Sequence, residues 1–518
     1  MSKVSICIML ITLRTLSITA HCATDLPTIE WQRSYGGTNS DILYALEHGG
    51  QGQLLMAGAA TIPGFWLLRT DSAGNPLSEI RHHGDAGDVA TACKMLPDGG
   101  FYLAGFSYSG ASGSKSSTNF GGADYWVLRL DASGSKIWDR SFGGSRDDYL
   151  TTMALSPDGG CLLGGFSASD TGGNKTTAGF GLEDYWVVRL GSDGSRLWER
   201  SFGTTNVDDL ECVLPISGNG YLLAGFSRGT PSGTLGGNRT NTGFGNFDYY
   251  VVRIDEGGNR LWETAHGGSS SDVLLCAAPT SDGGFVLGGR SVSDSNGTKL
   301  SQNFGGGDYW LVRIDANGQQ LWDQSYGGDG QDDLLSIEPL SEGFILAGRS
   351  TSGISGNKES ARFGAGDYWV VRINADGAKL WELSLGGTGD EWPYGILQTA
   401  DGGWVVAGYS GSGATGNKTT PPLRTTPGLF FDLDDVWVVK LGLPGVSLPP
   451  RLRWEEVSPQ HRLLLRGTSN FTYRTEVSSD FVNWTPFRTN QSGGSEVEVF
   501  RGDLNAPPNR FFRARTLP

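Results

Sequence analysis

The strongest constraint on the fold is a short motif of the form Asp-Tyr-Trp-Val-Val-Arg-Leu, which recurs seven times along the chain. The central aromatic residues of the copies are 59 to 68 residues apart and are Trp66, Trp126, Trp186, Tyr250, Trp310, Trp369 and Trp437. A regular period of this length is typical of repeat architectures. Residues shared by every copy are therefore expected to build the scaffold, and function is expected where the copies differ.

Each repeat predicts four β-strands. In the copy from Asp148 to Gly203, residues 148–156 and 161–167 read as two strands joined by a tight Pro-Asp-Gly-Gly turn. After a polar loop, residues 184–190 and 197–202 read as a second pair. The glycines of the chain, 80 in number, recur at fixed places between short runs of Val, Leu, Tyr and Trp, as turns between strands require. Four strands per unit is the content of a propeller blade, so the sequence predicts an all-β fold.

The two ends of the repeat region complement each other. Residues 29–37 match the fourth strand of a repeat and precede the first complete copy, whereas residues 436–441 form a third strand with no fourth strand after it. Pairing of the N-terminal strand with the last blade would close the ring and remove its open edge. We therefore expect a seven-bladed β-propeller.

Composition along the chain predicts four segments. Residues 1–23, with Lys3, an apolar stretch and small residues at its end, read as a secretory signal peptide. Lipidation of Cys22 is an alternative that the preceding His21 fits poorly. Residues 24–441 form the propeller, residues 442–450 a Pro- and Gly-rich linker, and residues 451–518 a small C-terminal β-sandwich. A secreted, extracellular or cell-surface location is expected.

Three recurring elements carry a family resemblance: Phe-Gly-Gly followed by Asp, Pro-Asp-Gly-Gly followed by Leu-Ala-Gly, and an Arg-Leu-Asp-x-x-Gly turn. Together they resemble the delta-60 repeat propellers of secreted bacterial proteins, from about Trp31 to Leu441. The hairpin at residues 315–322 is also similar to quinoprotein-like repeats, with a turn one residue shorter. The resemblance implies a propeller and does not imply one activity.

Charge and cysteine content exclude several classes of partner. The chain has 55 acidic and 40 basic residues and a formal net charge of −15, which argues against nucleic acid and anionic membranes. Beyond the signal segment no apolar run is long enough to span a bilayer. The four later cysteines lack C-x-x-C spacing, so no metal or redox centre is expected there. Cys212 and Cys276 share a repeat position; a disulfide is possible, but two buried thiols are favoured. We expect a monomer.

An acidic residue begins the first strand of every repeat: Asp41, Asp88, Asp148, Asp208, Asp272, Asp332 and Glu391. The first strand is innermost in a propeller, so these carboxylates are expected to ring the mouth of the central channel. Such a ring is costly unless each carboxylate is hydrogen-bonded or a cation lies among them. Capping of the adjacent Gly-Gly turn is the favoured role, and Ca²⁺ or a cationic ligand is the alternative. No other cofactor is predicted.

Two further sets recur in six copies. The Asp before the Tyr-Trp pair is expected to anchor the end of the long loop between the second and third strands, and a basic residue in that loop is expected to offset nearby carboxylates. The Asp set is Asp124, Asp184, Asp248, Asp308, Asp367 and Asp435. The basic set is Lys115, Lys175, Arg239, Lys299, Lys358 and Lys418.

The first and last blades depart most from the repeat. Blade 1 has a loop of only five residues, 60–64, whereas blade 7 has gained a loop at residues 411–433. These blades are neighbours at the closure of the ring, so a ligand site is predicted there, with Trp392, Tyr394, His82 and His83 nearby. Drift of terminal repeats is an equally good explanation. A packing role is a simpler interpretation of these histidines than a metal site.

Two functional hypotheses follow. The chain contains no G-x-S-x-G, H-E-x-x-H or P-loop motif, which favours a non-enzymatic extracellular binding or scaffold protein for a glycan or protein ligand. The alternative is a propeller enzyme. A glycosidase would need two carboxylates about 5–10 Å apart, and a quinoprotein-like dehydrogenase would be expected to carry a vicinal Cys pair, which is absent.

Overall fold

The computed structural model describes residues 26–37, 40–60, 64–216, 218, 220–229, 236–423 and 434–443, together with six strands between residues 451 and 516. The expected signal peptide, most of the expected linker and part of the blade 7 loop lie outside the described residues. Predictions about those segments stay predictions.

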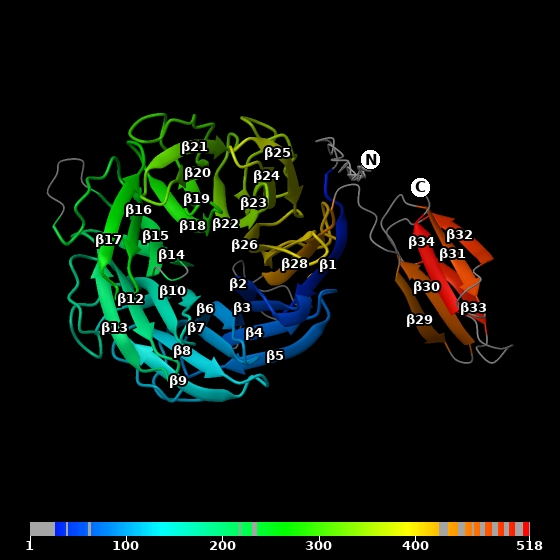
Figure 1. The fold of residues 1–518 in the computed structure, drawn as a ribbon, viewed down its shortest axis with the longest axis horizontal. Coiled ribbons are helices and arrows are strands. Elements are labelled where there is room, and N and C mark those ends of the chain that lie inside the picture. Colours follow the sequence, from blue (N-terminus) through cyan, green and yellow to red (C-terminus); the bar gives the residue numbers. More distant parts are fainter. Residues whose placement is uncertain are drawn as a thin grey trace, which may run out of the picture.

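Seven four-stranded antiparallel sheets form a closed ring of blades (Figure 1). In each blade we call the strands a to d from the channel outward. Strands a are β2 (Asp41–His48), β6 (Asp88–Met95), β10 (Asp148–Leu155), β14 (Asp208–Ile216), β18 (Asp272–Pro279), β22 (Asp332–Leu340) and β26 (Glu391–Gln398). Strands b are β3 (Leu54–Ala60), β7 (Phe101–Ser107), β11 (Cys161–Ser167), β15 (Gly220–Ser227), β19 (Phe285–Ser291), β23 (Gly343–Ser350) and β27 (Trp404–Ser410).

The outer half of each blade repeats the same hairpin. Strands c are β4 (Phe65–Thr70), β8 (Asp124–Leu130), β12 (Asp184–Leu190), β16 (Asp248–Ile254), β20 (Asp308–Ile314), β24 (Asp367–Ile373) and β28 (Asp435–Leu441). Strands d are β5 (Pro76–His82), β9 (Lys136–Phe142), β13 (Arg196–Phe202), β17 (Arg260–His266), β21 (Gln320–Tyr326), β25 (Lys379–Leu385) and β1 (Ile29–Tyr35). A short 3₁₀ turn, η1 (Gly50–Gly52), follows β2. The prediction of four-stranded blades is confirmed.

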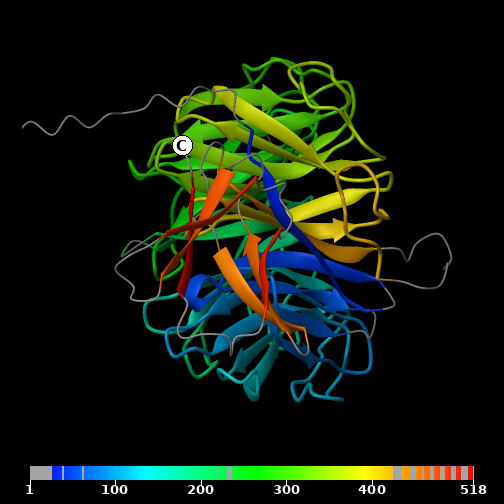
Figure 2. The ribbon, with the colours of Figure 1, turned by 90° about the vertical axis from the view of Figure 1, so that its right-hand side faces the viewer.

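The ring closes as the sequence predicts. Strand β1 pairs antiparallel with β28, so that Tyr35 lies opposite Val436 and Gln32 opposite Val439. The N-terminal strand β1 lies at the outer edge of blade 7, beside β28 (Figures 1 and 2). Consecutive a strands contact one another around the channel, and β26 contacts β2. Blade 7 therefore combines the two ends of the repeat region.

The recurrent Tyr-Trp pair packs each blade on the next. The ring of Tyr125 in blade 2 lies 4.7 Å from that of Trp186 in blade 3, and its hydroxyl donates a hydrogen bond of 2.9 Å to the Trp186 carbonyl. The same contact recurs at four further junctions. Each aromatic side chain can bury ~150–250 Å². The motif that reveals the repeat is thus the joint between neighbouring blades.

The C-terminal segment forms two three-stranded sheets that contact each other, as expected for a small sandwich. One sheet has the order β29-β30-β33 and the other β32-β31-β34. The strands are β29 (Arg451–Val457), β30 (Gln460–Arg466), β31 (Thr472–Ser478), β32 (Thr485–Gln491), β33 (Val497–Gly502) and β34 (Phe511–Thr516).

Two further points concern the described residues. Cys212 and Cys276 are free thiols, as are Cys93 and Cys161, so the cysteine pair forms no disulfide; Cys276 is buried and Cys212 is partly buried. Within the same part of the chain, no helix is long and apolar enough to cross a membrane.

Candidate binding site at the mouth of the ring

The carboxylates that begin the a strands are buried in the wall of the ring. All seven are at most 2% exposed. Each accepts a hydrogen bond of 2.6–3.0 Å from a backbone N–H of the turn that precedes its strand. In blade 3, for example, Asp148 accepts from Gly144 and from the Ser169 hydroxyl. These carboxylates therefore cap their own turns and do not face the channel as a ring.

The strand-c aspartates anchor the loops before them, as expected. Asp124 Oδ2 accepts a hydrogen bond from the Phe120 N–H, and the same bond from a Phe four residues earlier recurs in four copies. In blade 7, Asp435 Oδ2 accepts instead from the Leu423 N–H. At five junctions this Asp and the next strand-a carboxylate lie on either side of one turn glycine, so that a Cβ on Gly143 would overlap Asp124 Oδ1 and lie 2.9 Å from Asp148 Oδ2. Burial, followed by the neighbouring carboxylates, raises the pKa of Asp124 to about 7.

The loop cations offset this buried negative charge. The six basic side chains are at most 4% exposed and lie 4.8–5.9 Å from the centre of a strand-c aromatic ring. Lys115 donates hydrogen bonds to the Ser141 hydroxyl at 2.7 Å and the Ser117 carbonyl at 3.0 Å. Burial lowers the pKa of Lys115, and Asp139 and Asp124 oppose that shift. Each cation is thus internal to its blade. Among the described residues, no group of three or more His, Cys, Asp or Glu side chains could hold a metal ion.

The junction after blade 1 keeps the strand-a cap at Asp88 but lacks the strand-c Asp, the loop cation and the turn glycine. Gly64 holds the place of the strand-c Asp, the short loop has no basic residue, and His83 replaces the turn glycine. A Cβ on Gly64 would lie 2.7 Å from that of His83, so the missing Asp side chain makes room for the histidine. His82 is 9% exposed at the end of the outermost strand, 3.3 Å from the Gly134 carbonyl. His82 therefore packs within blade 1, whereas His83 is exposed on the turn.

Trp392 and Tyr394 lie elsewhere, on the innermost strand β26. Trp392 Nε1 donates to Asp390 at 2.9 Å, and the Arg349 guanidinium lies 4.6 Å from the Trp392 ring centre. Tyr394 makes an edge contact with Tyr44 at 5.2 Å. The four residues predicted as one ligand site are thus divided between the channel wall and the outer strand and turn of blade 1. Because Trp392 and Tyr394 lie on the innermost strand, the channel becomes the candidate for a ligand site.

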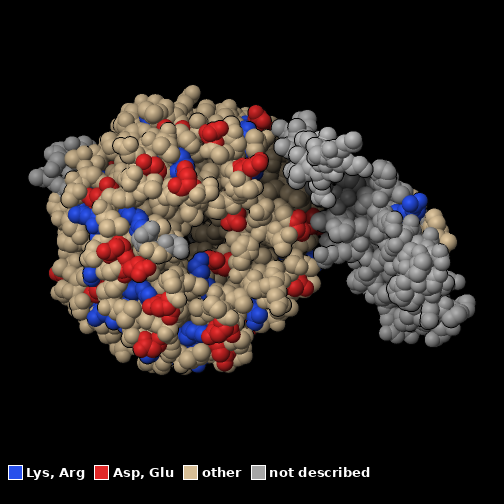
Figure 3. Space-filling view, in the orientation of Figure 1, with Lys and Arg blue, Asp and Glu red and all other residues tan. Residues whose placement is uncertain are grey.

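The second residue of each strand a and the next-to-last residue of each strand b surround the end of the channel where strand a begins. We call this end the mouth. Strand-a residues at this position are aliphatic in three blades, aromatic in two and acidic in two: Ile42, Val89, Tyr149, Asp209, Val273, Asp333 and Trp392. Figure 3 shows that the centre of the ring is hollow. The mouth is therefore the part of the repeat in which the blades diverge.

Blades 2 and 3 contribute a continuous set of aromatic side chains to the mouth. The ring centre of Tyr149 lies 4.9 Å from Phe106 and 5.3 Å from Phe166. Tyr108, 44% exposed, joins the set through a hydroxyl–hydroxyl hydrogen bond of 2.5 Å to Tyr149. We call these four residues the aromatic cluster. Sequence reasoning missed it, although a comparison of the seven copies at these two positions would have singled it out.

Charged residues occupy other parts of the mouth. In blades 5 and 6, Arg290 pairs with Asp333 at 3.0 Å, and the Gln331 side-chain amide donates to the same carboxylate at 2.8 Å. In blade 4, Asp209 Oδ1 is buried without a hydrogen-bond partner. Burial, followed by the charges of Glu183 and Glu211, raises the pKa of Asp209 to about 8. The mouth therefore combines aromatic faces, internal ion pairs and one carboxyl group without a counter-ion.

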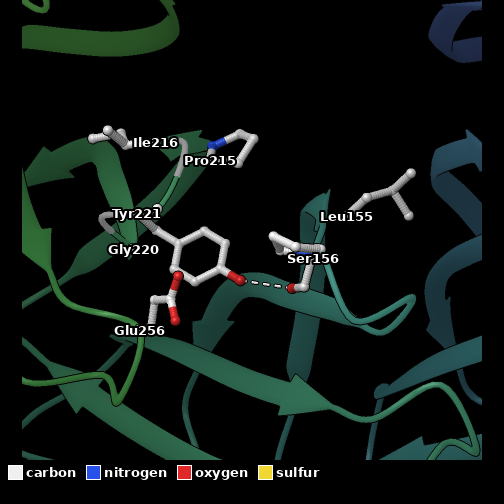
Figure 4. A pocket seen from close by; sticks show the side chains of 9 residues that line it. Leu155, Ser156, Pro215, Ile216, Gly220, Tyr221 and Glu256 are labelled. Carbon is white, nitrogen blue, oxygen red and sulfur yellow. Dashed lines mark hydrogen bonds between the residues drawn. The ribbon is translucent and has the colours of Figure 1, made fainter.

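A separate pocket lies at the opposite end of the strands, between blades 3 and 4. Its volume is about 270 Å³ and its walls include Leu155, Pro215 and Ile216. Figure 4 shows the Tyr221 side chain directed toward Ser156, with a hydroxyl–hydroxyl hydrogen bond of 2.6 Å. Because these hydroxyl groups satisfy each other, the pocket offers a ligand mainly apolar surface.

Comparison with known proteins gives distant likenesses. No family model matches the chain. The regulatory protein FlaEY of Caulobacter vibrioides is 24% identical over 321 residues, which cover 56% of this chain and 32% of that protein. The chain thus spans about a third of the length of this relative.

Two solved structures illustrate the similarity in shape. The periplasmic gluconolactonase PpgL of Pseudomonas aeruginosa has a TM-score of 0.41 and 12% identity, over 92% of this chain and 99% of that one. The polysaccharide lyase Uly1 has a TM-score of 0.40 and 11% identity, over 78% of this chain and 89% of that one. These likenesses assign no activity to the chain, and its propeller fold rests on its own strand pairing.

Proposed function

We propose that this chain is a secreted, non-enzymatic binding protein of the delta-60 repeat type and that the mouth of its propeller takes up a glycan. The observation that carries the proposal is the aromatic cluster of Phe106, Tyr108, Tyr149 and Phe166. The flat apolar face of a sugar ring packs well on aromatic rings, and tyrosine adds a polar group at the edge. Specific sites combine such apolar lining with a few placed polar groups.

The geometry around the cluster supports this use. The cluster is held by strands β7, β10 and β11 and by the residue that follows β7, so its rings belong to a rigid wall. Tyr108 is 44% exposed although it touches Phe106 and Tyr149. Packing between blades is already supplied by the Tyr-Trp joints of strand c. The aromatic cluster is therefore not needed to hold the blades together, and we attribute it to binding of a ligand.

A glycan array with the folded protein tests the proposal. We expect binding to a restricted group of glycans and a loss of roughly tenfold or more in affinity for Tyr149→Ala, since burial of an aromatic face contributes a few kcal/mol. Leu321→Ala on the outermost strand, where Leu321 is 56% exposed, is the matched control and should bind normally. Absence of binding to any glycan, or equal binding by the two variants, would sink the proposal.

A glycosidase is the second candidate, because Asp209 and Glu211 place two carboxyl groups on the same inner strand. The strand carries a bulge between Leu210 and Cys212, and inverting glycosidases separate their two carboxyl groups by ~6.5–9.5 Å. Burial raises the pKa of Glu211 to about 7, so both groups have the raised values that a general acid needs. Release of reducing ends from a bound polysaccharide, lost in both Asp209→Asn and Glu211→Gln, would establish this candidate in place of the first.

A further inference from the structure

Asp209 in blade 4 and Asp333 in blade 6 occupy the same position in the repeat but have different surroundings. Asp333 is 4% exposed and is paired with Arg290 from the preceding blade and with the Gln331 amide. The corresponding residues around Asp209 are Phe166 and Val207, neither of which can donate a hydrogen bond from its side chain. Asp333 thus has a counter-ion within the described part of the protein, whereas Asp209 has none there.

The charges near Asp209 add to the cost of ionising its carboxyl group without a cationic partner. The groups that act on it electrostatically are Glu183, Glu211 and Asp208, all of them acidic. In the described part of the chain, no ion pair or hydrogen bond joins Asp209 to a basic side chain. Asp209 is partly buried, and ionisation of its carboxyl group without a partner is unfavourable there; an ammonium or guanidinium group removes that cost. Binding of a cation would therefore be favoured at this position.

Aromatic faces lie on the same side of the mouth. Phe226 pairs with Asp209 across the sheet, Phe166 holds the place of the arginine that serves Asp333, and Tyr149 stacks on Phe166. An ammonium group over an aromatic face is attracted to the ring in addition to its attraction to a carboxylate. Carboxylate and aromatic rings together form the recognition chemistry of an amine.

We propose that the mouth binds the ammonium group of an amine-bearing glycan, such as an oligosaccharide of deacetylated amino sugars, with Asp209 as the counter-ion. This inference rests on the proposed function and names the class of glycan. A saccharide fits better than a lysine side chain because the aromatic cluster extends from Phe166 to Tyr108, across two blades. A single ammonium needs one ring, whereas successive sugar rings use the whole row.

The test compares oligosaccharides of glucosamine with the same oligosaccharides after N-acetylation, by calorimetry on the full chain. Acetylation removes the charge and keeps the ring, and we expect it to weaken binding roughly tenfold or more. Asp209→Asn should weaken binding of the amine form by a similar factor and leave the acetylated form unchanged. Asp193→Asn, an acid in an exposed turn of blade 3, is the matched control and should bind both forms normally.

The neighbouring blade supplies a second variant. Phe166→Arg reproduces the arginine of blade 5, so it should fill the site with an internal cation and abolish binding of the amine form. Phe166→Leu keeps an apolar side chain and should weaken binding less. Far-ultraviolet circular dichroism establishes that each variant is folded.

The outcomes separate this inference from the proposed function. Equal binding of the two saccharide forms, with loss in Tyr149→Ala and none in Asp209→Asn, overturns the inference and leaves glycan binding intact. Binding of oligolysine without binding of either saccharide overturns both, and so does absence of binding to any of these probes.

Discussion

The buried carboxylate pairs between blades predict that removal of one charge stabilises the ring at alkaline pH. Asp184 is 1% exposed, and its Oδ1 has no hydrogen-bond partner. Gly203 lies between Asp184 and Asp208, so that the two acids face each other across one glycine. Burial, then the nearby Asp208, raises the pKa of Asp184 to about 7 against the favourable effects of the Phe180 N–H and Lys175. Asp184→Asn keeps the shape and cannot ionise.

The direction in which stability changes with pH follows from proton binding. The pKa of Asp184 is raised in the folded state from 3.8 to about 7, so the folded protein holds a proton that the unfolded chain releases. Stability from this group is complete below about pH 4 and is lost as the pH rises through about 7. A shift of this size corresponds to about 4 kcal/mol in full, of which roughly 3 kcal/mol falls between about pH 4.5 and pH 8.5. Asp184→Asn does not incur this loss.

Urea unfolding followed by tryptophan fluorescence measures the effect. We expect Asp184→Asn to gain roughly 3 kcal/mol over the wild type between the two pH values, with an unchanged dependence on urea. Asp193→Asn is the control in the same blade, because the Asp193 carboxylate is exposed and hydrogen bonds from Ser195 lower its pKa. A pH-independent difference for Asp184→Asn, or a larger loss of stability at pH 8.5, would refute the reasoning.

Three further predictions concern the scaffold. Gly143→Ala should destabilise the protein by ~2 kcal/mol or more, because its Cβ would overlap Asp124 Oδ1, and Asp124→Gly in the same chain should restore part of the loss in urea unfolding. Deletion of Ile29–Tyr35 leaves β28 as an unpaired edge; light scattering should then show association, and a monomer as stable as the wild type would contradict this. Cys212 and Cys276 should react with a thiol reagent only after unfolding, since both are free and largely enclosed; reaction in the native state would count against their packing.

The repeat made most of the fold predictable from sequence. The period, the Tyr-Trp pair and the incomplete repeats at each end predict seven blades and a closure through β1, and the structure has both. Strand-a carboxylates were correctly favoured as turn caps because each follows a Gly-rich turn of fixed length. These features rest on local sequence and on symmetry, which a single chain displays when it contains seven copies of one unit.

The mouth was less predictable because its contacts join neighbouring blades. Phe106 meets Tyr149, and Arg290 meets Asp333, across about forty residues of sequence. Loop lengths drew attention to blades 1 and 7, but the length of a loop does not tell which way adjacent side chains face. His82 accordingly lies at the end of the outer strand of blade 1, while Trp392 lies on the innermost strand of blade 7.

Departures from the repeat are of two kinds, and only one of them indicates function. At the junction after blade 1, Gly64 and His83 exchange the usual places of a large and a small residue, and the loop cation is lost with the Asp that it would offset. Such a correlated set restores packing and charge balance, so it needs no ligand. Asp209 departs without compensation: its carboxyl is retained inside the mouth while the arginine that would pair with it is replaced by Phe166. Binding of a cationic ligand can relieve the cost of ionising Asp209 in the free protein. At the blade 1 junction no such cost is left, so a ligand site is inferred at blade 4 and not there.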